Sequence, residues 1–139
     1  MQDFNYEHSN CFEITVELTC CKYPDGSTLV EEWINNKESM LKYMEAVHLG
    51  VKGLIKDKNT GDPITKAVVE IEGIDKKIYS TDQGEYWRLL TPNENKIYKM
   101  KVSADGYKTS QTFEIVVKEG TDMVIQNVEL LSEKITKGE

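Results

Sequence analysis

The hydrophobic pattern of this chain changes its period at Gly50, and this change limits the possible fold more than any other feature. After Gly50, short β-rich runs are separated by Gly, Asn, Asp and Pro. Before it, apolar residues recur at helical spacing: Val30, Trp33, Ile34, Leu41, Met44 and Val47. The sequence therefore predicts one amphipathic helix followed by an all-β domain.

The helix is expected to run from Thr28 to about His48. Thr28 and Glu31 have the spacing of a capping box, and Gly50 fits a C-terminal stop. Its apolar face, with Trp33, must either pack on the β domain or leave an exposed patch prone to association. We expect Trp33, and Trp87 in a later strand, to lie in the core. No chemical role is assigned to Arg88.

Seven strands are predicted after Gly50, and their spacing is typical of a sandwich or a barrel. The clearest alternation places Tyr98, Met100 and Val102 on one face and Lys99 and Lys101 on the other. The predicted strands are Val51–Lys56, Ala67–Glu72, Lys77–Thr81, Tyr86–Leu90, Ile97–Ala104, Thr109–Val117 and Met123–Leu130.

A further strand is predicted at Phe12–Leu18, where apolar residues alternate with Glu13, Thr15 and Glu17. A polar stretch with Asp3 and Tyr6 precedes it. Nothing earlier in the sequence explains what this strand would pack against. We therefore expect the first residues to be the end of a larger structure whose earlier part is absent.

The 139 residues carry a net charge of −7, which repels phosphate backbones and argues against a nucleic-acid partner. No run of 18 apolar residues predicts a membrane span, and the start does not have the pattern of a signal peptide. The three cysteines are Cys11, Cys20 and Cys21. Either these thiols are reduced and intracellular, or a disulfide partner lies upstream.

Five stretches of the sequence carry a resemblance to a known family: MQDFNY, NCFEITVELTCCKYP, VHLGVKG, GDPITKAVVEIEGID and GEYWRLLTP. In this order and spacing, the chain resembles the zinc metallocarboxypeptidases of the N/E type over essentially its whole length. The resemblance implies a mainly β fold, in which a strand and a long helix left from the α/β catalytic domain precede a seven-stranded transthyretin-like β-sandwich. The implied domains are residues 1–50 for the catalytic fragment and 51–133 for the sandwich, with a charged tail at 134–139.

The resemblance also implies site residues. Glu17 matches the family's catalytic glutamate, which acts as general base on the zinc-bound water and then passes the proton to the leaving amine. Gln2 and Asp3 match the wall of the pocket for the substrate's C-terminal side chain, and Tyr6 matches a structural tyrosine. Judged by its strand alone, Glu17 is one carboxylate on a solvated face.

Zinc is the cofactor of the family, but this chain lacks the family's ligand pattern, a His-x-x-Glu pair and a later histidine. His8 and His48 stand in no such motif, so no metal-binding residue is assigned. His8 is interpreted as a loop histidine, and His48 as a helix C-terminal one.

The implied function is that of the C-terminal part of an enzyme that removes C-terminal Lys or Arg from peptides. We expect this chain to be inactive alone. The alternative is a non-catalytic transthyretin-like module of a truncated isoform, acting in folding or protein interaction. The exposed helix or the strand Phe12–Leu18 would then supply the contact surface. The family implies an extracellular or secretory location for the parent protein.

Overall fold

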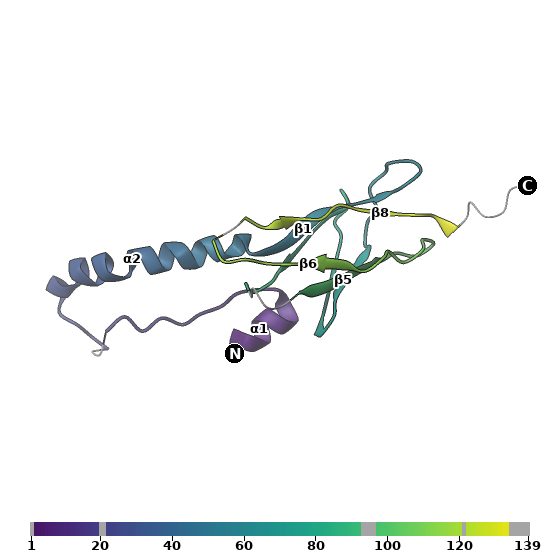
Figure 1. Ribbon diagram of the computed structural model, residues 1–139. Helices are drawn as coiled ribbons and strands as arrows, with labels where there is room; N and C mark the ends of the chain where they lie inside the picture. Colours follow the sequence, from purple (N-terminus) through teal and green to yellow (C-terminus); the bar gives the residue numbers. More distant parts are fainter. Residues whose placement is uncertain (1, 20–21, 93–96, 121, 134–139) are drawn as a thin grey trace, which may run out of the picture.

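The computed structural model describes residues 2–19, 22–92, 97–120 and 122–133. A β-sandwich forms one end of an elongated molecule, and a long helix projects from it (Figure 1). The predicted architecture, a mainly β domain preceded by a long helix, is confirmed. Cys20, Cys21 and the predicted tail at 134–139 lie outside the described residues.

The long helix α2 spans Leu29–Glu45 and is flanked by the 3-10 turns η1, Gly26–Thr28, and η2, Ala46–His48. The predicted capping box is wrong, because the Thr28 hydroxyl donates to the Asp25 carbonyl at 2.8 Å. The Asp25 carboxylate instead accepts from the backbone N–H of Ser27 at 2.9 Å. The helix therefore begins through a capped 3-10 turn.

The first sheet is built around the strand β1, Gly50–Asp57. On one side β1 pairs antiparallel with β4, Glu85–Leu89. On the other it pairs parallel with β7, Val124–Ile125, and then with β8, Val128–Leu130. Every strand of this sheet therefore pairs with β1.

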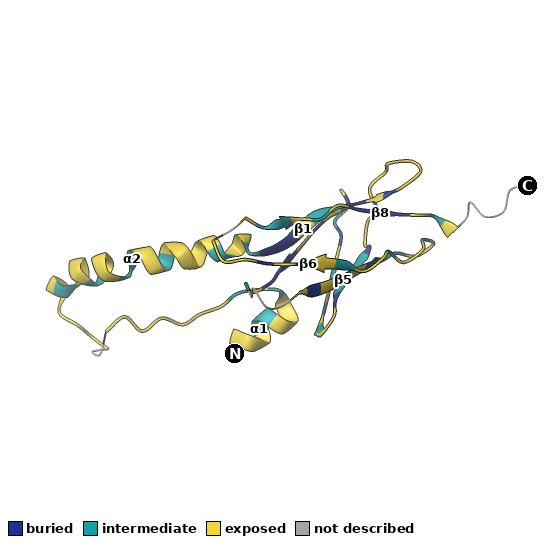
Figure 2. Ribbon diagram, viewed as in Figure 1, coloured by how far each residue is buried: buried dark blue, intermediate teal, exposed yellow. Residues whose placement is uncertain are grey.

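The second sheet is antiparallel throughout and has the order β3-β2-β5-β6. Its strands are β2, Val68–Ile71, β3, Ile74–Tyr79, β5, Tyr98–Ser103, and β6, Phe113–Ile115. The predicted alternation is confirmed, since Tyr98, Met100 and Val102 are buried and Lys99 and Lys101 are exposed. Figure 2 shows the buried residues between the two sheets.

The predicted strand Met123–Leu130 is interrupted, so the described residues form eight strands rather than seven. The break falls at Gln126 and Asn127, where the Gln126 carbonyl accepts from the Tyr86 hydroxyl at 2.6 Å. The Asn127 side chain accepts from the backbone N–H of Leu54 at 3.0 Å. A Cβ at Gly53 would overlap the Gln126 carbonyl. The chain can therefore run this close beside β1 only because residue 53 is glycine.

A second difference concerns β3, which begins at Ile74 rather than at the predicted Lys77. Gly73 has a φ of 80°, in the left-handed region that favours glycine. It closes a tight turn after β2, so the next strand starts at once.

Two expectations for the first residues are wrong. Gln2–Ser9 forms a helix, α1, so His8 is not a loop residue, and Phe12–Leu18 is not a strand. Phe12–Leu18 leaves α1 in the direction of α2 (Figure 1) and pairs with no strand among the described residues. A strand is stabilised by hydrogen bonds to a neighbouring strand. Alternation shows which side chains share a face, but it cannot supply that neighbour.

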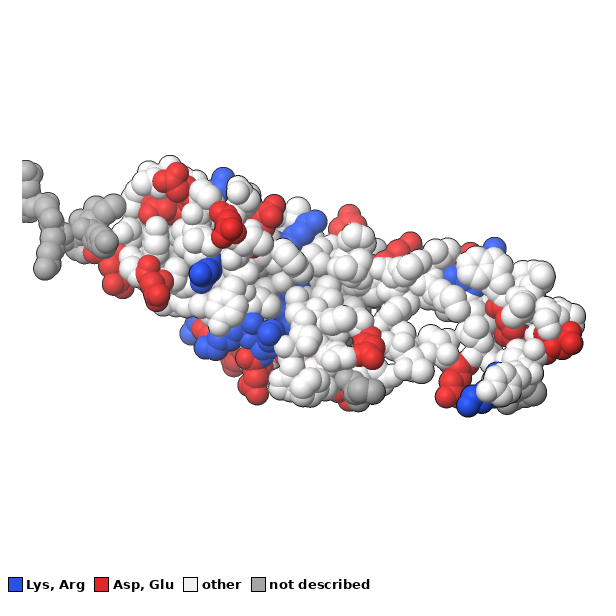
Figure 3. Space-filling view, turned by 180° about the vertical axis from the view of Figure 1, so that it is seen from behind, with Lys and Arg blue, Asp and Glu red and all other residues white. Residues whose placement is uncertain are grey.

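The helix α2 does not pack back on the sandwich, and it buries none of its residues (Figure 2). Exposed apolar residues of the helix and its following turn include Val30, Trp33, Ile34, Leu41, Met44 and Val47, and we call these six the α2 apolar face. Trp33 is 57% exposed and Trp87 is 53% exposed, so their predicted core positions are wrong. Figure 3 shows broad uncharged areas around the helix and mixed charges over the sandwich.

Replacing Gly53 by Ala should lower the free energy of unfolding by about 2 kcal/mol or more, because the new methyl group must separate β1 from the Gln126 backbone. Chemical denaturation of the 139-residue chain measures this change. Gly26→Ala is the matched control, since no atom lies within 4 Å of its Cβ position. It should change stability by less than about 0.5 kcal/mol. Equal effects of the two substitutions would contradict the close approach.

The α2 apolar face should bind an apolar dye and make the 139-residue chain self-associate. Trp33→Glu should weaken the association about tenfold or more, because it removes a large apolar contact. Sedimentation over a concentration series measures this change. Asn35→Glu adds the same charge on the opposite face of the helix and should have little effect. A dye-negative monomer at all concentrations would show that the face is covered in solution.

Candidate functional site

The N-terminal segment, residues 2–19, docks on the end of β4 through the side chain of Asn10. Its Oδ1 accepts from Arg88 Nη1 at 2.8 Å and from the backbone N–H of Leu89 at 2.9 Å. Its Nδ2 donates to the carbonyl of Trp87 at 3.4 Å. Asn10 has a φ of 53°, a left-handed conformation that asparagine tolerates better than most residues. We call these three hydrogen bonds the Asn10 contact.

Arg88 is the charged centre of this junction and is fully buried, with 0% exposure. The ring of Tyr6 lies 5.4 Å from its guanidinium carbon, within the range of a cation–π interaction. Burial lowers the pKa of Arg88, and the nearby Tyr6 opposes this shift. Its Nε and Nη2 atoms are buried and find no hydrogen-bond partner among the residues that the structure describes. Asn10 therefore supplies the hydrogen bond seen at this guanidinium.

Aromatic packing fixes the segment on both sides of Asn10. The rings of Tyr6 and Phe12 stack with centroids 5.4 Å apart, and Phe4 lies 4.4 Å from His8 on α1. Burial raises the pKa of Tyr6, and the neighbouring Tyr98 adds to this shift. The neutral phenol is therefore the favoured form at this junction.

A cavity of about 230 Å³ lies between α1 and the second sheet. Tyr6 and His8 line it from α1, and Asp75 and Tyr98 line it from β3 and β5. The Tyr98 hydroxyl donates to the carbonyl of Thr91 at 2.9 Å. A second cavity of about 340 Å³ has a more apolar lining that includes Phe12, Tyr43, Met44 and Trp87. Both cavities border the docked segment, which therefore has open space on two sides.

The predicted site residues all lie in the N-terminal segment. Gln2 and Asp3 are in the first turn of α1, and Glu17 lies in the extended part that leads to α2. All three are exposed. The chain between them leaves α1 in the direction of the start of α2 (Figure 1), so they form no enclosed site in this structure.

The described part of the chain contains no group of three His, Cys, Asp or Glu side chains that could hold a metal ion. His8 packs on Phe4, and His48 lies in η2. Cys11 is an exposed free thiol. The residues that the structure describes therefore do not fit a zinc site by themselves. Within the same ranges, no helix combines the length and the apolar character that a membrane span needs.

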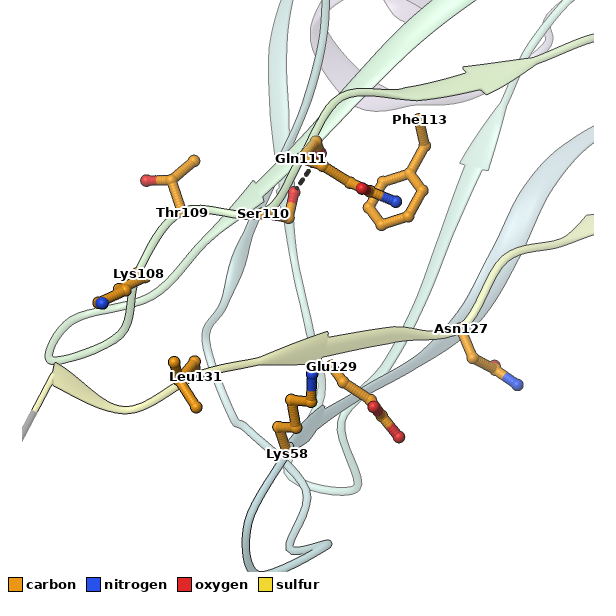
Figure 4. Close-up of a pocket in the computed structure, with 9 residues that line it drawn as sticks. All are labelled: Lys58, Lys108, Thr109, Ser110, Gln111, Phe113, Asn127, Glu129 and Leu131. Atoms are coloured by element: carbon orange, nitrogen blue, oxygen red, sulfur yellow. Dashed lines mark hydrogen bonds between the residues drawn. The ribbon is translucent and has the colours of Figure 1, made fainter. Parts of the chain in front are cut away.

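A further groove, with a volume of about 490 Å³, lies at an edge of the sandwich (Figure 4). It runs between the chain before β6, with Ser110 and Gln111, and the strand β8, with Glu129. Lys58 and Lys108 lie at its border. Its lining has one carboxylate and no histidine or cysteine. We assign it no chemistry, because its polar side chains are typical of a solvated sheet edge.

Sequence reasoning missed Asn10 and Arg88, the two residues that hold the junction together. A signal for Arg88 was present, since a charged residue stands inside the apolar run Tyr86–Leu90 and shares the inward-facing side of the alternation with Tyr86. Such a residue must find a partner. Nothing in the sequence indicates that this partner lies 78 residues earlier.

Comparison with known proteins agrees with the resemblance read from the sequence. Over 111 residues the chain is 52% identical to carboxypeptidase D of Drosophila melanogaster, covering 79% of this chain and 8% of that protein. Over 120 residues it is 46% identical to carboxypeptidase D of Homo sapiens, covering 86% of this chain and 8% of that protein. Over 107 residues it is 45% identical to the carboxypeptidase N catalytic chain of Homo sapiens, covering 77% of this chain and 22% of that protein. The chain thus spans less than a quarter of each of these relatives.

The similarity is not confined to the sandwich. Residues 50–139 number 90, so an alignment of 120 residues includes at least 30 of the first 49. The helix α2 therefore lies within the part of the chain that is similar to carboxypeptidase D. Residues 50–131 match the carboxypeptidase regulatory-like domain, which takes in more than half of the chain. The chain therefore belongs to the carboxypeptidase regulatory-like domain family and is similar to carboxypeptidases D and N.

Proposed function

We propose that this chain is the C-terminal part of a metallocarboxypeptidase that removes C-terminal Lys or Arg from peptides. The observation that carries the proposal is the 46% identity to a carboxypeptidase D over an alignment that reaches at least 30 residues into the first 49. The proposed site residues Gln2, Asp3 and Glu17 also belong to these first 49 residues. A truncated module working through its sandwich alone is not favoured, because the similarity extends well outside the sandwich.

In this proposal each of the three site residues has one role. Glu17 is the carboxylate that takes up a proton and returns it to the leaving amine, which is a role that suits a group able to ionise near neutral pH. Gln2 and Asp3 contribute to the pocket for the substrate's C-terminal side chain, where the Asp3 carboxylate complements the cationic end of Lys or Arg. The exposure of all three leaves them free to face another part of a longer protein.

Zinc is the cofactor of the proposed enzyme, and its ligands would come from another part of that protein. The described side chains of this chain include no group of three His, Cys, Asp or Glu that could hold the ion. We further propose that the longer protein acts in the secretory pathway or outside the cell, as the family resemblance implies. The α2 apolar face would then be covered by the rest of the catalytic domain.

Glu17→Gln in the longer protein should lower kcat for a peptide ending in Arg by about 10²–10⁴-fold, because the amide cannot shuttle a proton. Release of the C-terminal Arg measures the rate, and the zinc content should not change. Glu13→Gln is the matched control, since Glu13 is an exposed glutamate of the same segment. It should keep kcat within about twofold. A fully active Glu17→Gln variant would exclude Glu17 as the base.

The 139-residue chain by itself should neither cleave such a peptide nor bind one zinc ion per chain. The reason is that the described residues supply no three converging ligands. Equilibrium dialysis against zinc and the same peptide assay test both expectations. Stoichiometric zinc together with release of C-terminal Arg would show that the chain carries a complete site.

A further inference from the structure

The Asn10 contact joins the segment that carries the proposed site residues to the sandwich that follows it. Asn10 lies seven residues after Asp3 and seven before Glu17. Its partners Arg88 and Leu89 belong to β4, which pairs directly with the central strand β1. The contact therefore connects the segment that carries the proposed site residues to the strand next to β1.

We propose that Asn10 and Arg88 are positioning residues, through which the regulatory-like sandwich sets the geometry of the proposed active site. The catalytic consequence of this inference rests on the proposed function, whereas the docking itself does not. Neither residue is proposed to touch the substrate. They act by fixing where α1 and the following extended chain lie on the sandwich.

The contact has the directionality that a positioning role needs. One oxygen, Asn10 Oδ1, accepts hydrogen bonds from two adjacent residues of β4, from the side chain of Arg88 and from the backbone N–H of Leu89. Two donors at one sp² oxygen fix the plane of the amide as well as its position. The Tyr6 ring 5.4 Å from the guanidinium adds a further constraint on α1. Arg88 is fully buried, so losing Asn10 would leave a charged donor without this acceptor.

The length of α1 makes the proposed pocket residues sensitive to this contact. Its eight residues span about 12 Å. A tilt of about 5° at the Asn10 end therefore moves Gln2 by about 1 Å. Displacements of this size at a catalytic site can cost about 10²-fold in rate. Loosening a contact that touches no substrate can thus change catalysis.

The docking is tested on the 139-residue chain by hydrogen exchange. In Asn10→Ala, the amides of residues 6–12 should exchange at least tenfold faster than in wild type, and the sandwich amides should not change. Asn10→Asp keeps an acceptor oxygen for Arg88 and should restore protection. Asn35→Ala, an exposed asparagine on α2, is the control. Unchanged exchange in both Asn10→Ala and Arg88→Met would overturn the docking, whatever the activity.

The positioning role is tested in the longer protein with a peptide ending in Arg. Asn10→Ala should lower kcat 10- to 100-fold at unchanged zinc content and with a thermal midpoint close to that of wild type. Asn10→Asp should recover most of the rate, which a general loss of stability would not predict. Faster exchange with wild-type kcat would overturn the positioning role. A wild-type protein without carboxypeptidase activity would overturn the proposed function and this catalytic role, while the exchange result would still decide the docking.

Discussion

The pairing of β1 with three other strands is the interaction on which the rest of the structure depends. β1 takes β4 on one side and both β7 and β8 on the other, so the first sheet exists only through it. Two glycines make this central position possible. A side chain at Gly50 would overlap the Arg88 carbonyl, and one at Gly53 would overlap the Gln126 carbonyl. The backbones of β4 and of the C-terminal strands can therefore approach β1 closely.

The same strand also determines where the outlying parts of the chain lie. α2 leads into β1 through η2, so the direction of β1 sets the direction in which the helix projects (Figure 1). β4 is held against β1 and offers Arg88 and the Leu89 backbone to Asn10. The N-terminal segment is thus connected to β1 indirectly, through β4. The sandwich forms the scaffold, and the exposed helix and segment are the parts left free for another surface.

The sequence predicts the part of the fold that depends on local patterns. Alternation around Met100 and the helical spacing around Trp33 correctly predict a strand and a helix, although only the strand buries its apolar face in this structure. The same reasoning fails for Phe12–Leu18, where the pattern is present and the neighbouring strand is not. It also fails for the break after Ile125, because that break results from a contact with Gly53. Contacts between distant residues leave no periodic trace.

The candidate site likewise has a part that the sequence predicts and a part that it does not. Gln2, Asp3 and Glu17 come from family resemblance, and their roles stay predictions. The Asn10 contact could not be predicted, because it depends on a left-handed asparagine and a buried arginine far apart in the sequence. Only the charge inside the apolar run around Arg88 indicated that some partner was required. The family resemblance thus supplied candidate roles for three residues. The structure added the Asn10 contact, which joins the segment that carries these residues to the sandwich.

The sequence separation in the Asn10 contact has a consequence for how the protein is made. Arg88 is synthesised 78 residues after Asn10, so at about 5–20 residues per second the segment leaves the ribosome roughly 4–16 s before its docking surface does. The partners of β1 in β7 and β8 are made later still. During this interval the segment and the helix have no finished sandwich to meet. The segment that carries the proposed base is therefore translated well before the strand on which it docks.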